Sequence, residues 1–152
     1  MIARKDLIAG IHALWPHLID GHRAGGHIFA PDAEYHAPHM AHVEELWQTQ
    51  WRGKARYIRE AWDCDDYALQ FLATTRLYVA GLVWAGLLDG AVARPWAVGE
   101  CWGTRFRGRD TGHAINIVRL SDGGLWLLEP QADEFLIWNA TGDGDTPHYI
   151  RM

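Results

Sequence analysis

The stretch at residues 62–71, WDCDDYALQF, places a cysteine where a long amphipathic helix is expected to begin. Asp63 is a favourable N-cap residue, and Asp66, three positions later, can return a hydrogen bond to the amide of the cap residue, as in a capping box. Cys64 then lies in the first helical turn, where unpaired backbone amides and the helix dipole favour a thiolate. Cys64 is therefore the candidate nucleophile.

Two carboxylates beside this cysteine oppose the thiolate form. Asp65 and Asp66 add negative charge close to the sulfur, so a cationic partner, most simply a histidine, is needed from elsewhere in the chain. A free cysteine is more often a small buried residue than a reactive one. A purely structural role for Cys64 therefore stays open.

The composition describes one compact domain over residues 1–152, with an apolar fraction of 49% that is ample for a core. A formal charge of −5 argues against nucleic acid or an anionic membrane as the partner. The apolar stretch 77–88 is about half the ~20 residues that span a bilayer. The N-terminus shows no secretory signal pattern, so we expect a protein that is cytoplasmic or released without a signal peptide.

Helical periodicity covers the first half of the chain. Apolar residues recur at helical spacing over 7–19 and 40–50, and a long helix is expected from Cys64 as far as Leu88. The segment 20–38, rich in Gly, His and Pro, is expected to be a surface loop.

The periodicity becomes strand-like after the stop signal Asp89-Gly90. Strands are expected over 98–106, 113–120 and 125–129, with 135–138 and 148–150 as further candidates. Helices followed by strands predict an α+β layer arrangement and not a βαβ repeat.

Histidines and tryptophans are both abundant. His36, His39 and His42 lie three apart, which makes a metal site conceivable, but a proline between the first two interrupts any helix, and structural or solvent-facing histidines are the preferred interpretation. The nine tryptophans occur in every element and are expected to line the core and the cleft, in preference to a sugar-stacking platform. Trp62, beside Cys64, is the exception that could face a substrate.

A hairpin supplies the partner that Cys64 needs. His113 opens one predicted strand and Glu129 closes the next, and the turn 122–124 joins the two strands. In an antiparallel pair the start of the first strand lies beside the end of the second, so His113 and Glu129 should be neighbours. A histidine held by a carboxylate can take a thiol proton and later protonate a leaving amine.

Three ordered blocks, residues 63–68, 112–118 and 127–131, carry a family resemblance. The sequence resembles the papain-like and transglutaminase-like cysteine peptidase superfamily, and is most similar to the C-terminal protease domain of Marasmius oreades agglutinin-type lectins. The resemblance implies a papain-like α+β fold in which N-terminal helices and a long central helix pack on an antiparallel sheet. It also implies a thiol protease, a hydrolase that forms an acyl-enzyme with a peptide or protein substrate through the catalytic triad Cys64, His113 and Glu129.

The resemblance further implies calcium, since the agglutinin-type proteases use it, and Asp65 and Asp66 are acidic groups that could take part; the metal ligands themselves stay unknown. In that family a β-trefoil sugar-binding domain precedes the protease domain. A chain of 152 residues has no room for both, so lectin activity is not carried over from that family.

Two alternatives to the protease stay open. The same triad serves any acyl transfer, so an acyl transferase or amidase is the first. The second is a non-catalytic binding or virion-associated module that keeps the fold. A missing oxyanion-hole glutamine favours this second alternative, because Gln48 and Gln50 lie far upstream of the cysteine, although an indole such as that of Trp62 could replace it. Retention of all three triad residue types opposes it.

Overall fold

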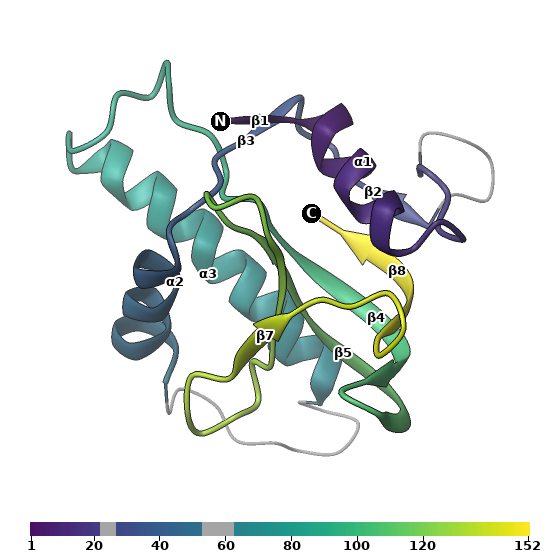
Figure 1. Ribbon diagram of the computed structural model, residues 1–152. Coiled ribbons are helices and arrows are strands. Elements are labelled where there is room, and N and C mark those ends of the chain that lie inside the picture. Colours follow the sequence, from purple (N-terminus) through teal and green to yellow (C-terminus); the bar gives the residue numbers. More distant parts are fainter. Residues whose placement is uncertain (22–26, 53–62) are drawn as a thin grey trace.

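A computed structural model describes residues 1–21, 27–52 and 63–152 of the chain (Figure 1). The elements, in chain order, are β1 (Ile2–Ala3), α1 (Arg4–Leu14), β2 (Ile28–Phe29), β3 (Glu34–Tyr35), α2 (Met40–Leu46), the π-helical turn η1 (Trp47–Trp51), α3 (Cys64–Trp84), β4 (Val98–Phe106), β5 (Arg109–Arg119), β6 (Leu125–Leu128), β7 (Ile137–Asn139) and β8 (Thr146–Arg151).

A six-stranded sheet in the order β2-β8-β4-β5-β6-β7 forms the centre of the fold. The long antiparallel pair β4–β5 sets Cys101 opposite Ile115, and β8 joins the other edge of β4 with Ile150 opposite Cys101. At the far edge β2 pairs with β8 in parallel, so the sheet is mixed. The short strands β1 and β3 form a separate antiparallel pair.

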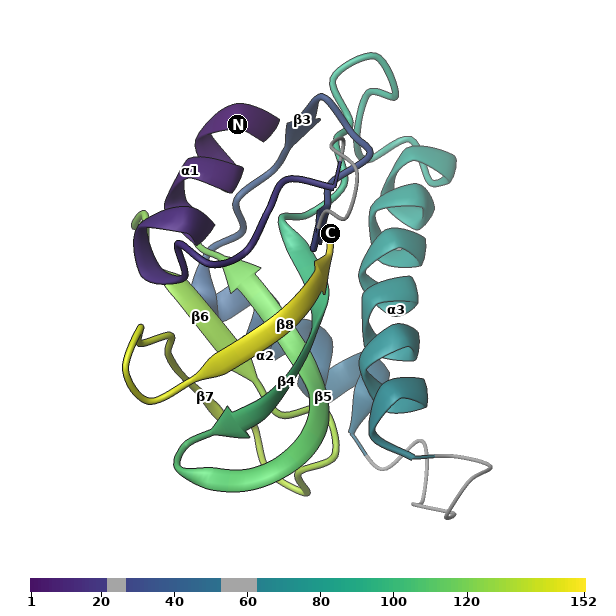
Figure 2. The ribbon, with the colours of Figure 1, turned by 90° about the vertical axis from the view of Figure 1, so that its right-hand side faces the viewer.

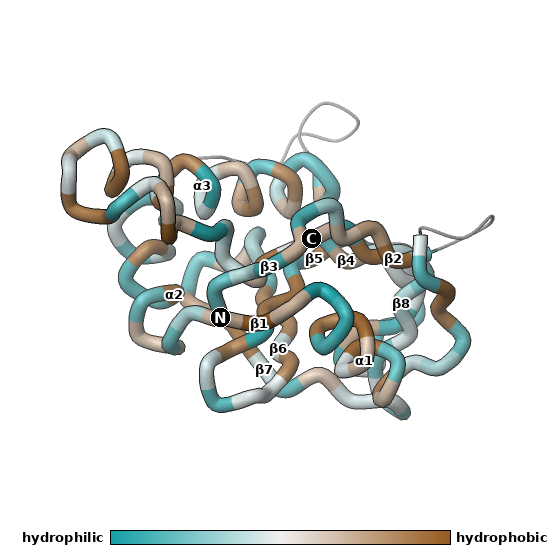
Figure 3. Tube along the Cα trace, turned by 90° about the horizontal axis from the view of Figure 1, so that it is seen from above, coloured by the Kyte–Doolittle hydropathy of each residue, from teal (hydrophilic) through white to brown (hydrophobic). Residues whose placement is uncertain are grey.

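Helices cover both faces of this sheet. Figure 2 shows α1 on one side of the strands and α3 on the other, and the view from above in Figure 3 shows hydrophobic segments in both helices. Side chains alternate along each strand, so β4 sends Cys101 into the core beneath α1 and Val98 into the core beneath α3.

Helix α3 begins where the sequence predicts. The capping box is present, and the Asp63 amide donates to Asp66 Oδ2 over 3.2 Å. Inside the fold, the buried Asn116 of β5 donates to the Ala68 carbonyl of α3 over 2.8 Å, which ties the helix to the sheet. Across the described ranges, no helix is long and apolar enough to cross a membrane.

The helix ends earlier than predicted, at Trp84 and not at Leu88. Gly86 takes a left-handed conformation, with φ of 70°, and this conformation terminates helices. The final predicted strands also shift, to Ile137–Asn139 and Thr146–Arg151.

The structure shows that the predicted strand arrangement of the sheet is wrong. A papain-like α+β arrangement on an antiparallel sheet is expected from the sequence, whereas the observed sheet is mixed and includes β2, which lies inside the segment predicted as a loop. The physical reason is that β2 is only two residues long and is held by the distant C-terminal strand. Local periodicity cannot show such a pairing.

Candidate functional site

Cys64 lies half-buried at the first residue of α3, beside the start of β5. The backbone amide of Ala114 donates a hydrogen bond to its sulfur. The thiol opens onto a cleft of about 590 Å³ whose lining includes Trp102, His113 and Tyr149. The predicted position of Cys64 in the first helical turn is confirmed.

The surroundings of this thiol favour its neutral form. Burial raises the pKa of Cys64 above its ordinary value, and the nearby carboxylates of Asp63 and Asp65 raise that pKa further, whereas the hydrogen bond from Ala114 lowers it. The balance is upward. Burial and the two carboxylates therefore disfavour the thiolate that a helix N-terminus would otherwise favour.

We expect this raised pKa to be visible in the alkylation kinetics of Cys64. Iodoacetamide should modify Cys64 at pH 7 more slowly than an ordinary thiol of pKa ~8.5, and the rate should rise with pH beyond that value, because only the thiolate attacks. Mass spectrometry of the Cys64 peptide gives the rate, and Cys64→Ser is the control. Rapid alkylation at pH 6 that His113→Ala abolishes would contradict the neutral thiol.

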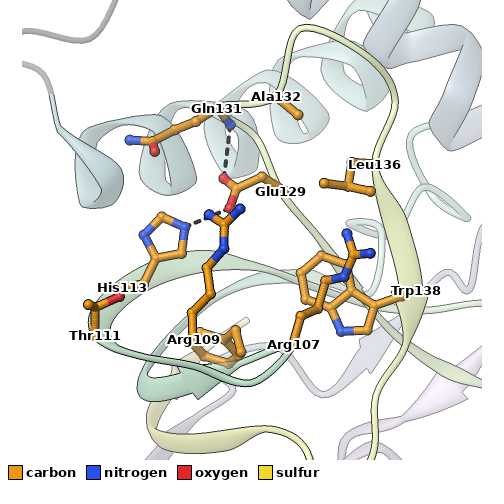
Figure 4. Close-up of a pocket in the computed structure, with 10 residues that line it drawn as sticks. Arg107, Arg109, Thr111, His113, Glu129, Gln131, Ala132, Leu136 and Trp138 are labelled. Atoms are coloured by element: carbon orange, nitrogen blue, oxygen red, sulfur yellow. Dashed lines mark hydrogen bonds and ion pairs between the residues drawn. The ribbon is translucent and has the colours of Figure 1, made fainter.

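The side chains of His113 and Glu129 form the shortest polar contact in the site. His113 Nε2 lies 2.6 Å from Glu129 Oε2, and the Gln131 amide donates to Glu129 Oε1 over 3.1 Å (Figure 4). The prediction that His113 and Glu129 are neighbours is confirmed. With both carboxylate oxygens engaged, Glu129 holds the imidazole in one orientation and directs its Nδ1 away from the carboxylate.

Two aromatic side chains also line the cleft, and although tryptophans are expected there, the sequence does not single out these two residues. Trp102 of β4 and Tyr149 of β8 are cross-strand neighbours, 39% and 36% exposed. Beside them the buried Glu100 forms an ion pair with Arg151 over 2.9 Å and a hydrogen bond with Trp102. Burial raises the pKa of Glu100. Strand alternation over 98–106 could have placed Glu100 and Trp102 on the same face.

His39 and His42, two of the three histidines considered for a metal site, contact protein groups, as the preferred structural interpretation expects. His39 packs edge-on against His42 with ring centres 5.4 Å apart, and its Nδ1 lies 2.7 Å from Ser121 Oγ. Within the described ranges, the one group that could hold a metal is Asp63, Cys64 and Asp65. Trp62, the tryptophan predicted to face a substrate, lies outside the described residues.

This acidic group does not fit the calcium that the resemblance implies. Calcium takes six to eight oxygen ligands, whereas this set supplies two carboxylates and a soft thiol. A hydrogen bond with Asp63, together with burial, raises the pKa of Asp65, so these carboxylates interact with each other. Asp66, the other acidic candidate, caps the helix. Calcium binding stays an untested prediction.

Comparisons with known proteins find likeness in structure alone: no family model and no curated protein sequence matches. A PSL1a–E64 complex matches 99% of this chain and 51% of its own, with a TM-score of 0.72 and 19% identity. The Polyporus squamosus lectin, bound to the human-type influenza-binding epitope Neu5Acα2-6Galβ1-4GlcNAc, matches 95% of this chain and 48% of its own, with a TM-score of 0.63 and 19% identity. The chain therefore spans about half the length of these structures.

These structures correct the assignment to papain-like and transglutaminase-like peptidases. The neighbours are described as PSL1a and as a lectin, the latter with a sugar epitope, and neither description names a peptidase. The papain-like fold label, the thiol protease activity and the hydrolase assignment are accordingly corrected. Burial and the neighbouring carboxylates also raise the pKa of Cys64, which opposes the thiolate that the predicted mechanism needs. No comparison tests the roles of Cys64, His113 and Glu129.

Proposed function

We propose that this chain is a non-catalytic module that binds a carbohydrate in the cleft at the N-terminus of α3. The observation that carries the proposal is the aromatic pair Trp102 and Tyr149, exposed side by side on adjacent strands in the wall of that cleft. Large aromatic side chains usually lie in the core, so a pair that lines a concave surface marks a ligand site.

The aromatic pair suits a sugar ring. Its apolar C–H face can pack on the indole and phenol rings, whose faces carry partial negative charge, while its hydroxyl groups remain at the edge for hydrogen bonds. The ion pair with Arg151 and the hydrogen bond with Trp102 hold Glu100, so its carboxylate is positioned before a ligand arrives.

We also propose Cys64, His113 and Glu129 as members of this binding site. His113 lines the cleft together with Trp102, and Glu129 fixes the orientation of its ring. The Cys64 thiol, which also lines the cleft, adds a weak donor. Ligand sites commonly combine an apolar wall with a few positioned polar groups of this kind.

The solved neighbours support a carbohydrate as the ligand class, since one of them is a lectin bound to Neu5Acα2-6Galβ1-4GlcNAc. This chain matches about half of that lectin. Sugar binding by this half is therefore our proposal for this chain and not a property carried over from the lectin.

We expect Trp102→Ala to weaken binding of Neu5Acα2-6Galβ1-4GlcNAc by roughly tenfold to a hundredfold, since truncating an aromatic anchor commonly costs more than about 1 kcal/mol. Isothermal titration calorimetry measures the change. Trp84→Ala is the matched control: Trp84 is 77% exposed at the far end of α3 and should leave affinity unchanged. Equal affinities of the two variants, or no binding by the wild type, would refute the proposal.

E64, the compound in the PSL1a structure, tests the non-catalytic part of the proposal. We expect intact-protein mass spectrometry after incubation with E64 at pH 7 to show the unmodified mass. A covalent adduct that maps to Cys64 and disappears in His113→Ala would mean that the thiol is activated. That result would overturn the non-catalytic proposal even if a sugar also binds.

A further inference from the structure

A second cavity, of about 570 Å³, adjoins the proposed sugar cleft and shares His113 with it. Its floor is the β4–β5 hairpin, which contributes Arg107, Arg109 and Thr111, and its side wall is Trp138 of β7. Figure 4 shows both arginine side chains extending from the hairpin into this space. No function proposed above uses these two cations.

The two arginines differ from the other cation of the hairpin. Arg105 is paired with Asp110, with an N–O distance of 3.3 Å. Arg107 stacks over the Trp138 ring at 5.4 Å, and among the described residues neither Arg107 nor Arg109 has an ion-pair partner. Guanidinium groups present planar, forked donors that match a carboxylate. The guanidinium groups of Arg107 and Arg109 therefore have N–H donors available for a ligand in this cavity.

The backbone at Arg107 supplies independent support. Arg107 and Gly108 form the two-residue turn with φ values of 52° and 75°, a conformation in which Asn and Gly are preferred. An arginine in this left-handed region is strained, and Asp145 helps to hold it by accepting a hydrogen bond from the Arg107 amide over 3.2 Å. A glycine at this position would remove the strain of the left-handed backbone. The presence of an arginine instead points to a binding role for its guanidinium group.

We infer that this cavity binds the carboxylate of an acidic sugar, and the inference rests on the proposed function of the adjoining cleft. Arg107 and Arg109 would pair with the carboxylate, while the sugar ring would extend past His113 toward Trp102. Glu129 also lines the cavity, but His113 and the Gln131 amide engage its oxygens, which reduces its repulsion of an anion.

The test compares N-acetylneuraminate with its uncharged methyl ester by calorimetry. We expect the acid to bind the wild type at least tenfold more tightly than the ester, and Arg109→Gln or Arg107→Gly to reduce this preference below twofold. Arg105→Gln is the matched control on the same hairpin and should keep the preference. Arg107→Gly should melt at the same or a higher temperature, because glycine relieves the strained φ, so loss of binding cannot reflect unfolding.

The outcomes separate this inference from the proposed function. Equal binding of acid and ester, with Trp102 still required, would overturn the carboxylate site and leave the sugar cleft standing. A preference for the acid that depends on both arginines, without binding of Neu5Acα2-6Galβ1-4GlcNAc, would support the anion site and overturn the sugar cleft. If neither N-acetylneuraminate nor Neu5Acα2-6Galβ1-4GlcNAc binds the wild type, both the carboxylate site and the sugar cleft are overturned. Inorganic phosphate, added as a competitor, shows whether the site prefers a carboxylate. Displacement of N-acetylneuraminate by an equal concentration of phosphate would contradict a preference for the carboxylate.

Discussion

Phe71→Ala is expected to lower the free energy of unfolding by about 3–5 kcal/mol, the range for deleting a large aromatic side chain from a packed core. Phe71 lies on the buried face of α3, and its ring meets Trp51 edge-on with centres 5.5 Å apart. It belongs to the core that joins α3 to the sheet. Truncation leaves a cavity beneath the helix that carries Cys64.

Urea denaturation at pH 7 measures this loss, and Leu69→Ala is the matched control. Leu69 lies two positions away on the same helix but is exposed, so its truncation should change the free energy of unfolding by less than about 1 kcal/mol. Similar losses for the two variants would mean that α3 does not pack on the sheet as described.

Asp145→Ala is expected to lower the free energy of unfolding by about 3 kcal/mol, because three partly buried donors lose their acceptor and a hydrogen bond typically contributes about 0.5–1.5 kcal/mol. Asp145 is 2% exposed, and its carboxylate accepts from the amides of Thr141 and Arg107 over 3.0 and 3.2 Å and from the Trp138 indole over 3.4 Å. These contacts connect the β4–β5 turn with β7.

The same substitution should also weaken binding of N-acetylneuraminate, since Asp145 positions both Arg107 and Trp138. Thermal melting and calorimetry on one preparation measure the two effects. Asp143→Ala, an exposed position in the same loop, should change neither, and Asp145→Asn should fall between the two because one acceptor oxygen remains. An Asp145→Ala variant as stable as Asp143→Ala would contradict the described network.

The two sites that we propose lie on one face of the molecule and share a residue. His113 lines both cavities, together with Trp102 and Tyr149 in one and with Arg107 and Arg109 in the other. Its bond to Glu129 fixes the ring between them. We therefore expect substitutions at His113 to affect the sugar and the carboxylate contacts together, in contrast to those at Trp102 or Arg109.

Local sequence patterns determined the elements on which this face is built. Asp63 and Asp66 specify the start of α3, because a cap depends on residues three positions apart. Turn residues 122–124 between two apolar runs specify the β5–β6 hairpin, and the pairing of adjacent strands then brings His113 beside Glu129. Each of these features needs only short-range information.

Only the tertiary structure decided the parallel pairing of β2 with β8, the exposure of Trp102 beside Tyr149 and the raised pKa of Cys64. Each depends on segments that are distant in the sequence and on how much protein covers the side chain. The sequence pattern of cysteine, histidine and acid indicated a nucleophile, but the ionisation of a thiol is set by burial and neighbouring charge. These are properties of the folded chain, which no spacing of residue types records.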